Sequence, residues 1–167
     1  MTETQIETPG MKLNITLGQA APKPESAVAA APAKKAEPVG GYWWGTGRRK
    51  SSVARVRIKP GSGKLLVNKR ELGSYFPRVQ DQNSVVAPLK AVGADGKFDI
   101  FINVRGGGTT GQAGAALLGI ARALRNYDST YVQALRDGGH LTRDPRMVER
   151  KKPGQSGARK RFQFSKR

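Results

Sequence analysis

Apolar and charged side chains alternate along the first strongly patterned stretch of the chain. Val53, Val56 and Ile58 are interleaved with Arg55 and Arg57. A period of two predicts a β-strand with one face buried and the other face wetted and basic.

Further alternation and turn signals extend this strand into a sheet. Residues 60–63, Pro-Gly-Ser-Gly, predict a turn, and residues 64–68 predict a return strand, so we expect a hairpin. Residues 98–105 alternate between apolar and other side chains and predict the clearest strand of the chain.

Three stretches favour helices. One covers about residues 82–91 and is interrupted or kinked at Pro88. The second begins after a glycine run and continues to about Asn126, with small and apolar residues on one face. The third covers about residues 129–137 and ends at a glycine pair, as at a C-terminal glycine cap. This order predicts an α+β fold, with helices packed on one face of a small sheet.

The charge of the chain indicates a binding protein. The 167 residues include 30 Lys or Arg and 12 Asp or Glu, which gives a net charge of +18 and a pI of about 10.9. Such an excess favours a polyanionic partner, nucleic acid before an acidic membrane. The chain has no Cys, one His (His140) and no apolar run long enough to span a bilayer. We therefore expect no metal, no cofactor, no membrane partner and no catalytic residues.

The basic residues are unevenly distributed and divide the chain. Residues 1–41 contain four Lys and four Glu, and from residue 18 they are mostly Ala, Pro, Lys and Glu. This composition predicts a disordered extension rather than a targeting signal. Residues 42–140 hold the patterned elements and predict a globular RNA-binding domain. Residues 141–167 are rich in cations without an amphipathic period, which predicts an extended basic tail.

Two segments are candidates for phosphate contact. Residues 45–52 place three consecutive cations before the first strand and suit either a solvated loop or a phosphate-contacting loop. Arg55 and Arg57 favour the second interpretation because they extend the basic surface. Residues 105–112 form a glycine-rich link from a strand to a helix, without the Gly-Lys-Ser/Thr of a Walker loop. We expect a turn whose exposed amides face RNA phosphate; a tight packing turn is the alternative.

Two aromatic clusters have different expected roles. Tyr42-Trp43-Trp44 could stack on unpaired bases, but we favour a cap on the hydrophobic core. In the tail, Phe162 and Phe164 lie among cations. Stacking groups beside charges favour contact with nucleic acid over a purely electrostatic anchor.

Short motifs run in order over residues 42–167. They are GTGRRK at 45–50, VARV at 53–56, VNKR at 67–70, YF at 75–76, GGG at 106–108, GQAGA at 111–115, GIARAL at 119–124, LTRD at 141–144, VERKK at 148–152 and QFSKR at 163–167. Together they resemble the bacterial-type S9 family of small-subunit ribosomal proteins. The chain departs from the family pattern at Leu117, Ser156-Gly157 and Phe162, so local contacts there are expected to differ.

The resemblance implies a ribosomal S5 domain 2-like α+β fold with a left-handed βαβ crossover. It also implies a cytoplasmic, ribosome-bound structural protein in the head of the small subunit, beside other head proteins. Its partners are then small-subunit ribosomal RNA and, through the tail, the anticodon stem-loop of P-site tRNA. The residues that we expect at ribosomal RNA are Arg48, Arg49, Lys50, Arg55, Arg57, Arg105, Gly107, Gly108, Gln112, Arg122, Arg143, Arg146, Arg150, Lys151, Lys152, Arg159, Lys160 and Arg161. The residues implied at P-site tRNA are Ser165, Lys166 and Arg167.

Two other classes of function stay open from the residues alone. A general nucleic-acid chaperone would also be small, basic and free of Cys, but it would bind unrelated duplexes equally well. An enzyme acting on a phosphorylated substrate could use the glycine-rich turn, although the sequence offers no base or metal ligand for it.

Overall fold

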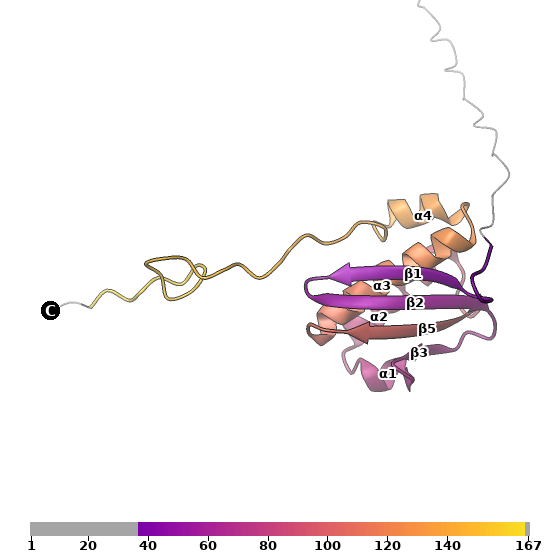
Figure 1. Cartoon of the computed structure of the whole chain (residues 1–167), viewed down its shortest axis with the longest axis horizontal. Helices are drawn as coiled ribbons and strands as arrows, with labels where there is room; N and C mark the ends of the chain where they lie inside the picture. Colours follow the sequence, from indigo (N-terminus) through magenta and orange to yellow (C-terminus); the bar gives the residue numbers. More distant parts are fainter. Residues whose placement is uncertain (1–36, 166–167) are drawn as a thin grey trace, which may run out of the picture. The chain divides into compact units, whose positions relative to one another are not determined.

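The computed structural model describes residues 37–165, which form a mixed α/β fold around a five-stranded sheet (Figure 1). The predicted disorder of residues 1–41 falls almost entirely outside these residues and stays a prediction. The elements of the described part are β1 (Trp43–Arg49), β2 (Ser52–Pro60), β3 (Leu65–Val67), β4 (Arg70–Glu71), α1 (Leu72–Tyr75), α2 (Val79–Val92), β5 (Phe98–Arg105), α3 (Thr109–Tyr127) and α4 (Tyr131–Asp137). None of the helices in this part is long and apolar enough to cross a membrane.

β1 is a strand where residues 45–52 predicted a loop. It pairs antiparallel with β2 along its whole length. Its buried positions are Gly45 and Gly47, and α3 lies directly against them. A Cβ on Gly45 would overlap the carbonyl oxygen of Gly119, and one on Gly47 would overlap that of Ala115. Glycine therefore permits close packing of the helix and removes the apolar alternation by which a strand is recognised.

The predicted hairpin between residues 53–58 and 64–68 is wrong. The strand order is β1-β2-β5-β3-β4, so β2 lies between β1 and β5, and β3 pairs parallel with β5. The Asp99 carboxylate at the start of β5 accepts hydrogen bonds from the backbone N–H groups of Ser62 and Lys64 at 2.9 and 3.1 Å. These bonds hold the turn after β2 at the start of β5. The chain therefore continues into β3 beside β5 and does not return along β2.

The helices pack on one face of the sheet, as predicted, and the core lies between the two layers (Figure 1). Ala54, Val56 and Ile58 of β2 point into this core with no exposed surface. Val53, in contrast, lies on the open face with Arg55, because the buried positions of the strand run from Ser52 through Ala54 in steps of two. The small side chain of Ala54 is what concealed the true alternation.

The three predicted helices, α2, α3 and α4, lie near their predicted positions, whereas the short helix α1 was not predicted. α2 begins earlier than expected and continues through the buried Pro88, so the predicted interruption is wrong and the alternative of a kink stays a prediction. α4 ends at the predicted glycine pair, where Gly139 has a φ of +68°. The Gly139 and His140 N–H groups donate to the carbonyls of Arg136 and Leu135 at 2.9 Å each, the pattern of a Schellman cap.

Candidate nucleic-acid interface

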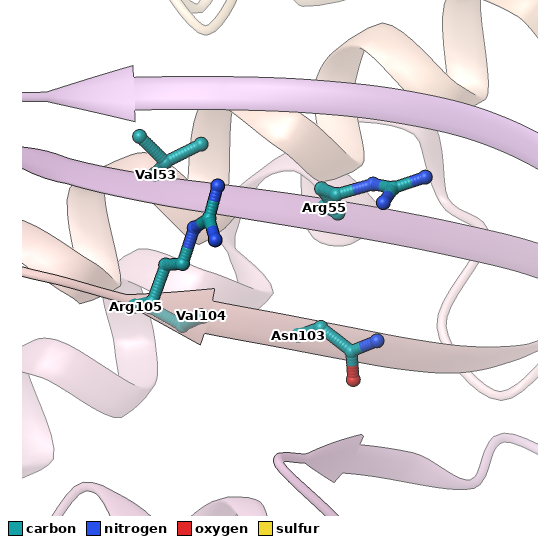
Figure 2. A pocket seen from close by; sticks show the side chains of 5 residues that line it. All are labelled: Val53, Arg55, Asn103, Val104 and Arg105. Atoms are coloured by element: carbon teal, nitrogen blue, oxygen red, sulfur yellow. The ribbon is translucent and has the colours of Figure 1, made fainter.

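The open face of the sheet gathers cations from three neighbouring strands. The register places Arg48 of β1 and Arg105 of β5 on either side of Val53, and it places Arg55 of β2 opposite Asn103. All three arginines are exposed. Figure 2 shows Arg105 extending from β5 over β2. Together with Arg55, Asn103 and two valines, it lines a hollow of about 240 Å³. β1 and β2 contain no Asp or Glu, so these strands offer no carboxylate to neutralise the cations.

Aromatic rings hold two of the arginines on this face. The guanidinium carbon of Arg57 lies 5.3 Å from the ring centroid of Tyr42 and 5.2 Å from that of Phe101. The guanidinium carbon of Arg55 lies 5.5 Å from the ring centroid of Trp44. Cation–π contacts restrict a guanidinium without cancelling its charge, so the charge stays available to an anion.

The aromatic run 42–44 divides between the two faces of the sheet. Trp43 packs edge-to-face on Tyr127 at 4.8 Å and joins the core, as expected. Trp44 is 37% exposed and lies on the open face, so the expected core cap is wrong for this residue. Successive side chains of a strand point to opposite faces of the sheet. Because β1 was not predicted as a strand, this division of Trp43 and Trp44 between the two faces was not expected.

The glycine turn between β5 and α3 lies against the turn between β1 and β2. Gly106 and Gly107 have φ values of +76° and +64°, and the Ser52 hydroxyl donates to the Gly106 carbonyl at 3.0 Å. Gly108 is the N-cap of α3, and the first turn of this helix has neither a side-chain cap nor an acidic residue. The structure thus brings Gly107, Gly108 and the uncapped amides of α3 close to the turn that contains Lys50.

Gln112, a predicted RNA contact, is bound within the protein. Its Nε2 donates to the Gly106 carbonyl at 3.1 Å, and its Oε1 accepts from the Tyr75 hydroxyl at 2.8 Å. Asn68 donates to the same hydroxyl at 3.2 Å. Gln112 therefore braces the glycine turn, a role that its position in the motif did not reveal.

Three further predicted cations have partners inside the protein. Arg122 donates to the Thr46 carbonyl at 2.7 Å, which ties α3 to β1. Arg49 and Arg146 share the carboxylate of Asp144, at 3.1 and 2.9 Å. Hydrogen bonds from Arg146, together with the charges of Arg146 and Arg49, hold the pKa of Asp144 well below its usual range. Arg49 thereby fixes the start of the C-terminal segment to β1.

The segment that follows α4 contains no helix or strand as far as residue 165. Within it, Arg159 donates to Glu149 at 3.1 Å, which raises the pKa of Arg159, and Lys152 lies 3.9 Å from the same carboxylate. The two cations at the very end, Lys166 and Arg167, lie outside the described residues. The other predicted contacts of this segment are exposed: Arg143, Arg150, Lys151, Lys160, Arg161 and Ser165.

Among residues 37–165, no group of three or more His, Asp or Glu side chains is placed to hold a metal ion. The single histidine, His140, is half-buried, and burial lowers its pKa. The site is a basic surface, with Arg55 and Arg57 held by aromatic rings and a helix start that has no side-chain cap, and it suits phosphate and aromatic bases.

Comparison with known proteins supplies the family. The model of the family described as ribosomal protein S9/S16 matches residues 47–167. The chain is 56% identical over 123 residues to small ribosomal subunit protein uS9 of Treponema pallidum (strain Nichols), an overlap of 74% of this chain and 95% of the relative. It is 50% identical over 135 residues to small ribosomal subunit protein uS9 of Rhodopirellula baltica, an overlap of 81% of this chain and 98% of the relative.

The chain therefore belongs to the ribosomal protein S9/S16 family, as its ordered motifs predicted. Members of this family are structural proteins of the ribosome rather than enzymes, so the alternative of an enzyme acting on a phosphorylated substrate is set aside.

Proposed function

We propose that this protein is a structural constituent of the small ribosomal subunit and binds ribosomal RNA, in the cytoplasm, through the open face of its sheet. The observation that carries the proposal is the set of exposed arginines, Arg48, Arg55 and Arg105, on three adjacent strands. The names of the relatives, which are small ribosomal subunit proteins, agree with it.

Binding is mostly electrostatic in this proposal. Each phosphate that an arginine neutralises releases condensed counterions, so affinity falls steeply as salt rises. Phosphate contacts position a protein without reading sequence. The amides at the start of α3 supply a second phosphate site beside Gly107 and Gly108, where the helix dipole favours an anion.

The proposal extends to the fold and its divisions. We assign residues 42–140 to an S5 domain 2-like RNA-binding domain, with residues 1–41 as a disordered extension. The parallel pairing of β3 with β5, linked through helices, supports a βαβ unit, which we propose crosses over left-handed. Neighbouring proteins of the subunit head complete its surroundings.

The C-terminal segment, residues 141–167, acts in this proposal as a basic tail. Its exposed cations bind ribosomal RNA, and Ser165, Lys166 and Arg167 reach the anticodon stem-loop of P-site tRNA. The ion pair from Arg49 to Asp144 supports this role, because it ties the start of the tail to the sheet that we propose faces RNA.

The test compares salt dependence in matched variants. The double variant Arg55→Gln, Arg105→Gln removes two charges from the open face, and Arg125→Gln, Arg136→Gln removes two exposed charges from α3 and α4. Binding to small-subunit ribosomal RNA is measured at rising KCl. The open-face variant is expected to flatten the slope of log K against log salt by about 0.7–0.9 for each phosphate that is no longer neutralised, and the helix variant to leave it unchanged.

Equal slopes in all three proteins would overturn the open face as the binding surface. Co-sedimentation with washed small subunits distinguishes a ribosomal constituent from the remaining alternative, a general nucleic-acid chaperone. A ribosomal constituent saturates at one copy per subunit, whereas a chaperone binds unrelated duplexes equally and does not saturate there.

A further inference from the structure

A two-glycine turn precedes β1 and folds the chain onto the edge of the open face. Val39 and Tyr42 exchange backbone hydrogen bonds at 3.0 and 3.3 Å around Gly40 and Gly41, whose φ values are +62° and +78°. Positive φ at both central residues defines a type I′ turn, which glycine forms without strain. The turn brings the Val39 carbonyl to the indole of Trp44, whose Nε1 donates to it at 3.3 Å.

The turn forms one wall of a hollow of about 740 Å³ at the start of β1 and the end of β2. The residues of the turn, and Trp44, all precede the part of the chain that the family model matches. Part of the lining therefore lies before the family model's match, although the 135-residue match to the Rhodopirellula baltica relative extends over it. Its lining residues are Val39, Gly40, Tyr42, Trp44, Arg55 and Arg57.

The lining combines aromatic faces with positive charge. Trp44 is one of the few large apolar side chains of the described part with more than a third of its surface exposed. Arg55 lies over its ring, and Arg57 lies near the rings of both Tyr42 and Phe101. The Nε of Arg57 is buried and has no hydrogen-bond partner in the described residues. The arginines are thus held by rings and keep their charge.

This chemistry distinguishes between possible ligands. An inorganic anion would use the arginines but leave the aromatic faces without a role, and an apolar peptide would cover two guanidinium charges without compensating them. A nucleotide uses both, because its base stacks on aromatic and guanidinium planes while its phosphate pairs with a cation.

We propose that this hollow binds one unpaired RNA nucleotide, with the base against Trp44 and Arg55 and the phosphate at Arg57. The inference rests on the proposed function of RNA binding, and adds a site for a base to a surface that otherwise contacts phosphates. Stacking tolerates any base, so the site selects single strands over duplexes rather than one sequence.

The experiment uses the full chain with Trp43→Phe. The chain has two tryptophans, so Trp44 is the one that remains. Its fluorescence is followed during titration with oligoadenylate and with an abasic oligonucleotide of the same length and charge. Anisotropy of labelled probes gives affinities for this protein and for versions that also carry Trp44→Leu or Trp44→Phe. Thermal unfolding of each protein confirms that it is folded.

We expect oligoadenylate to quench Trp44 and to bind about 5- to 150-fold more weakly to the Trp44→Leu protein, the loss that corresponds to one stacked base. Trp44→Phe keeps an aromatic face and should lose less. The abasic probe should bind all three proteins equally.

Equal binding of oligoadenylate by all three proteins would overturn the nucleotide site and leave the proposed function intact. Failure of both probes to bind at low salt would overturn the proposed function itself. If acrylamide does not quench the fluorescence of Trp44 in the free protein, another part of the chain fills the hollow. This result would also overturn the site.

Discussion

At the scale of the residue, two glycines on β1 determine how closely α3 approaches the sheet. Gly45 and Gly47 occupy the positions where a strand normally presents large apolar side chains. The backbone of α3 takes that space, and Gly119 of the helix in turn lies against Val56. Close contact of helix and strand replaces side-chain interdigitation here, and it leaves no room for a methyl group.

Gly47→Ala is expected to destabilise the fold by about 1–3 kcal/mol. Its Cβ would overlap backbone atoms of Ala115 and Gly119, which cannot move without shifting α3. Urea unfolding measures the effect. Gly73→Ala is the matched control, since a Cβ there meets open space and the change should stay within about 0.5 kcal/mol. Similar stabilities of the two variants would contradict this account of the packing.

Asp99 gives a second prediction at this scale. The N–H groups of Lys64 and Ser62 and the charge of Lys59 lower the pKa of this carboxyl, while burial opposes the shift. Because the pKa is lower in the folded than in the unfolded protein, the carboxylate stabilises the fold above the unfolded value of about 3.9. That contribution is lost as the pH falls through the folded pKa.

The free energy of unfolding of the wild type should therefore exceed that of Asp99→Asn near neutral pH, and this difference should shrink as the solution is acidified. Urea unfolding at a series of pH values measures it. A difference that is constant from neutral pH to the acid limit would show that the carboxylate charge does not hold the 61–64 turn.

At the scale of the element, left-handed glycines end two of the helices. Gly93 has a φ of +62° after α2, and its N–H donates to the Lys90 carbonyl while the Ala94 N–H donates to that of Leu89. Gly139 does the same after α4. Each cap satisfies terminal carbonyls and turns the chain toward the next segment, to β5 in one case and to the tail in the other.

Substitutions at Gly93 isolate the backbone cost of this cap, because a Cβ there would meet no atom within 4 Å. Gly93→Ala should lower the free energy of unfolding by about 1–2 kcal/mol, since a left-handed backbone is strained for alanine. Gly93→Asn should cost less, because asparagine tolerates that conformation. Thermal or urea unfolding gives the order, and an alanine variant as stable as the wild type would contradict it.

At the scale of the whole molecule, the cations have two different tasks. Arg49, Arg122, Arg146 and Arg159 bind carboxylates or carbonyls of the protein itself. On the open face, Arg48, Arg55 and Arg105 find no carboxylate on β1 or β2, which lack acidic residues, whereas Lys59 lies 3.8 Å from the carboxylate of Asp99 on β5. Net charge alone therefore overstates the number of cations available to RNA, and salt dependence is the measurement that counts them.

Deletion of Ser165 to Arg167 should leave assembly of the small subunit intact and weaken retention of P-site tRNA. The reason is that the domain supplies the proposed binding surface for ribosomal RNA, while the last residues supply only the proposed tRNA contact. Filter binding of tRNA to subunits that carry the deletion measures the effect. Removal of residues 2–4 is the control of equal length, and normal tRNA affinity after the C-terminal deletion would refute the proposed contact.

The sequence by itself determined the class of fold, the family, and several elements, namely β5, α3 and the glycine end of α4. These depend on local signals: strict alternation, a small-residue helical face, and a residue type required by one backbone conformation. The ordered motifs identified the family because many short matches in one order are far more specific than any one of them.

Only the tertiary structure decided which elements become neighbours and which cations are free. β1 was hidden because its inward positions are glycines, and the apparent hairpin failed because Asp99, distant in sequence, binds the turn after β2. Arg49 and Gln112 likewise meet their partners, Asp144 and Tyr75, only across the folded chain. Local patterns record propensity, whereas strand order and ion pairing depend on contacts between residues far apart in sequence.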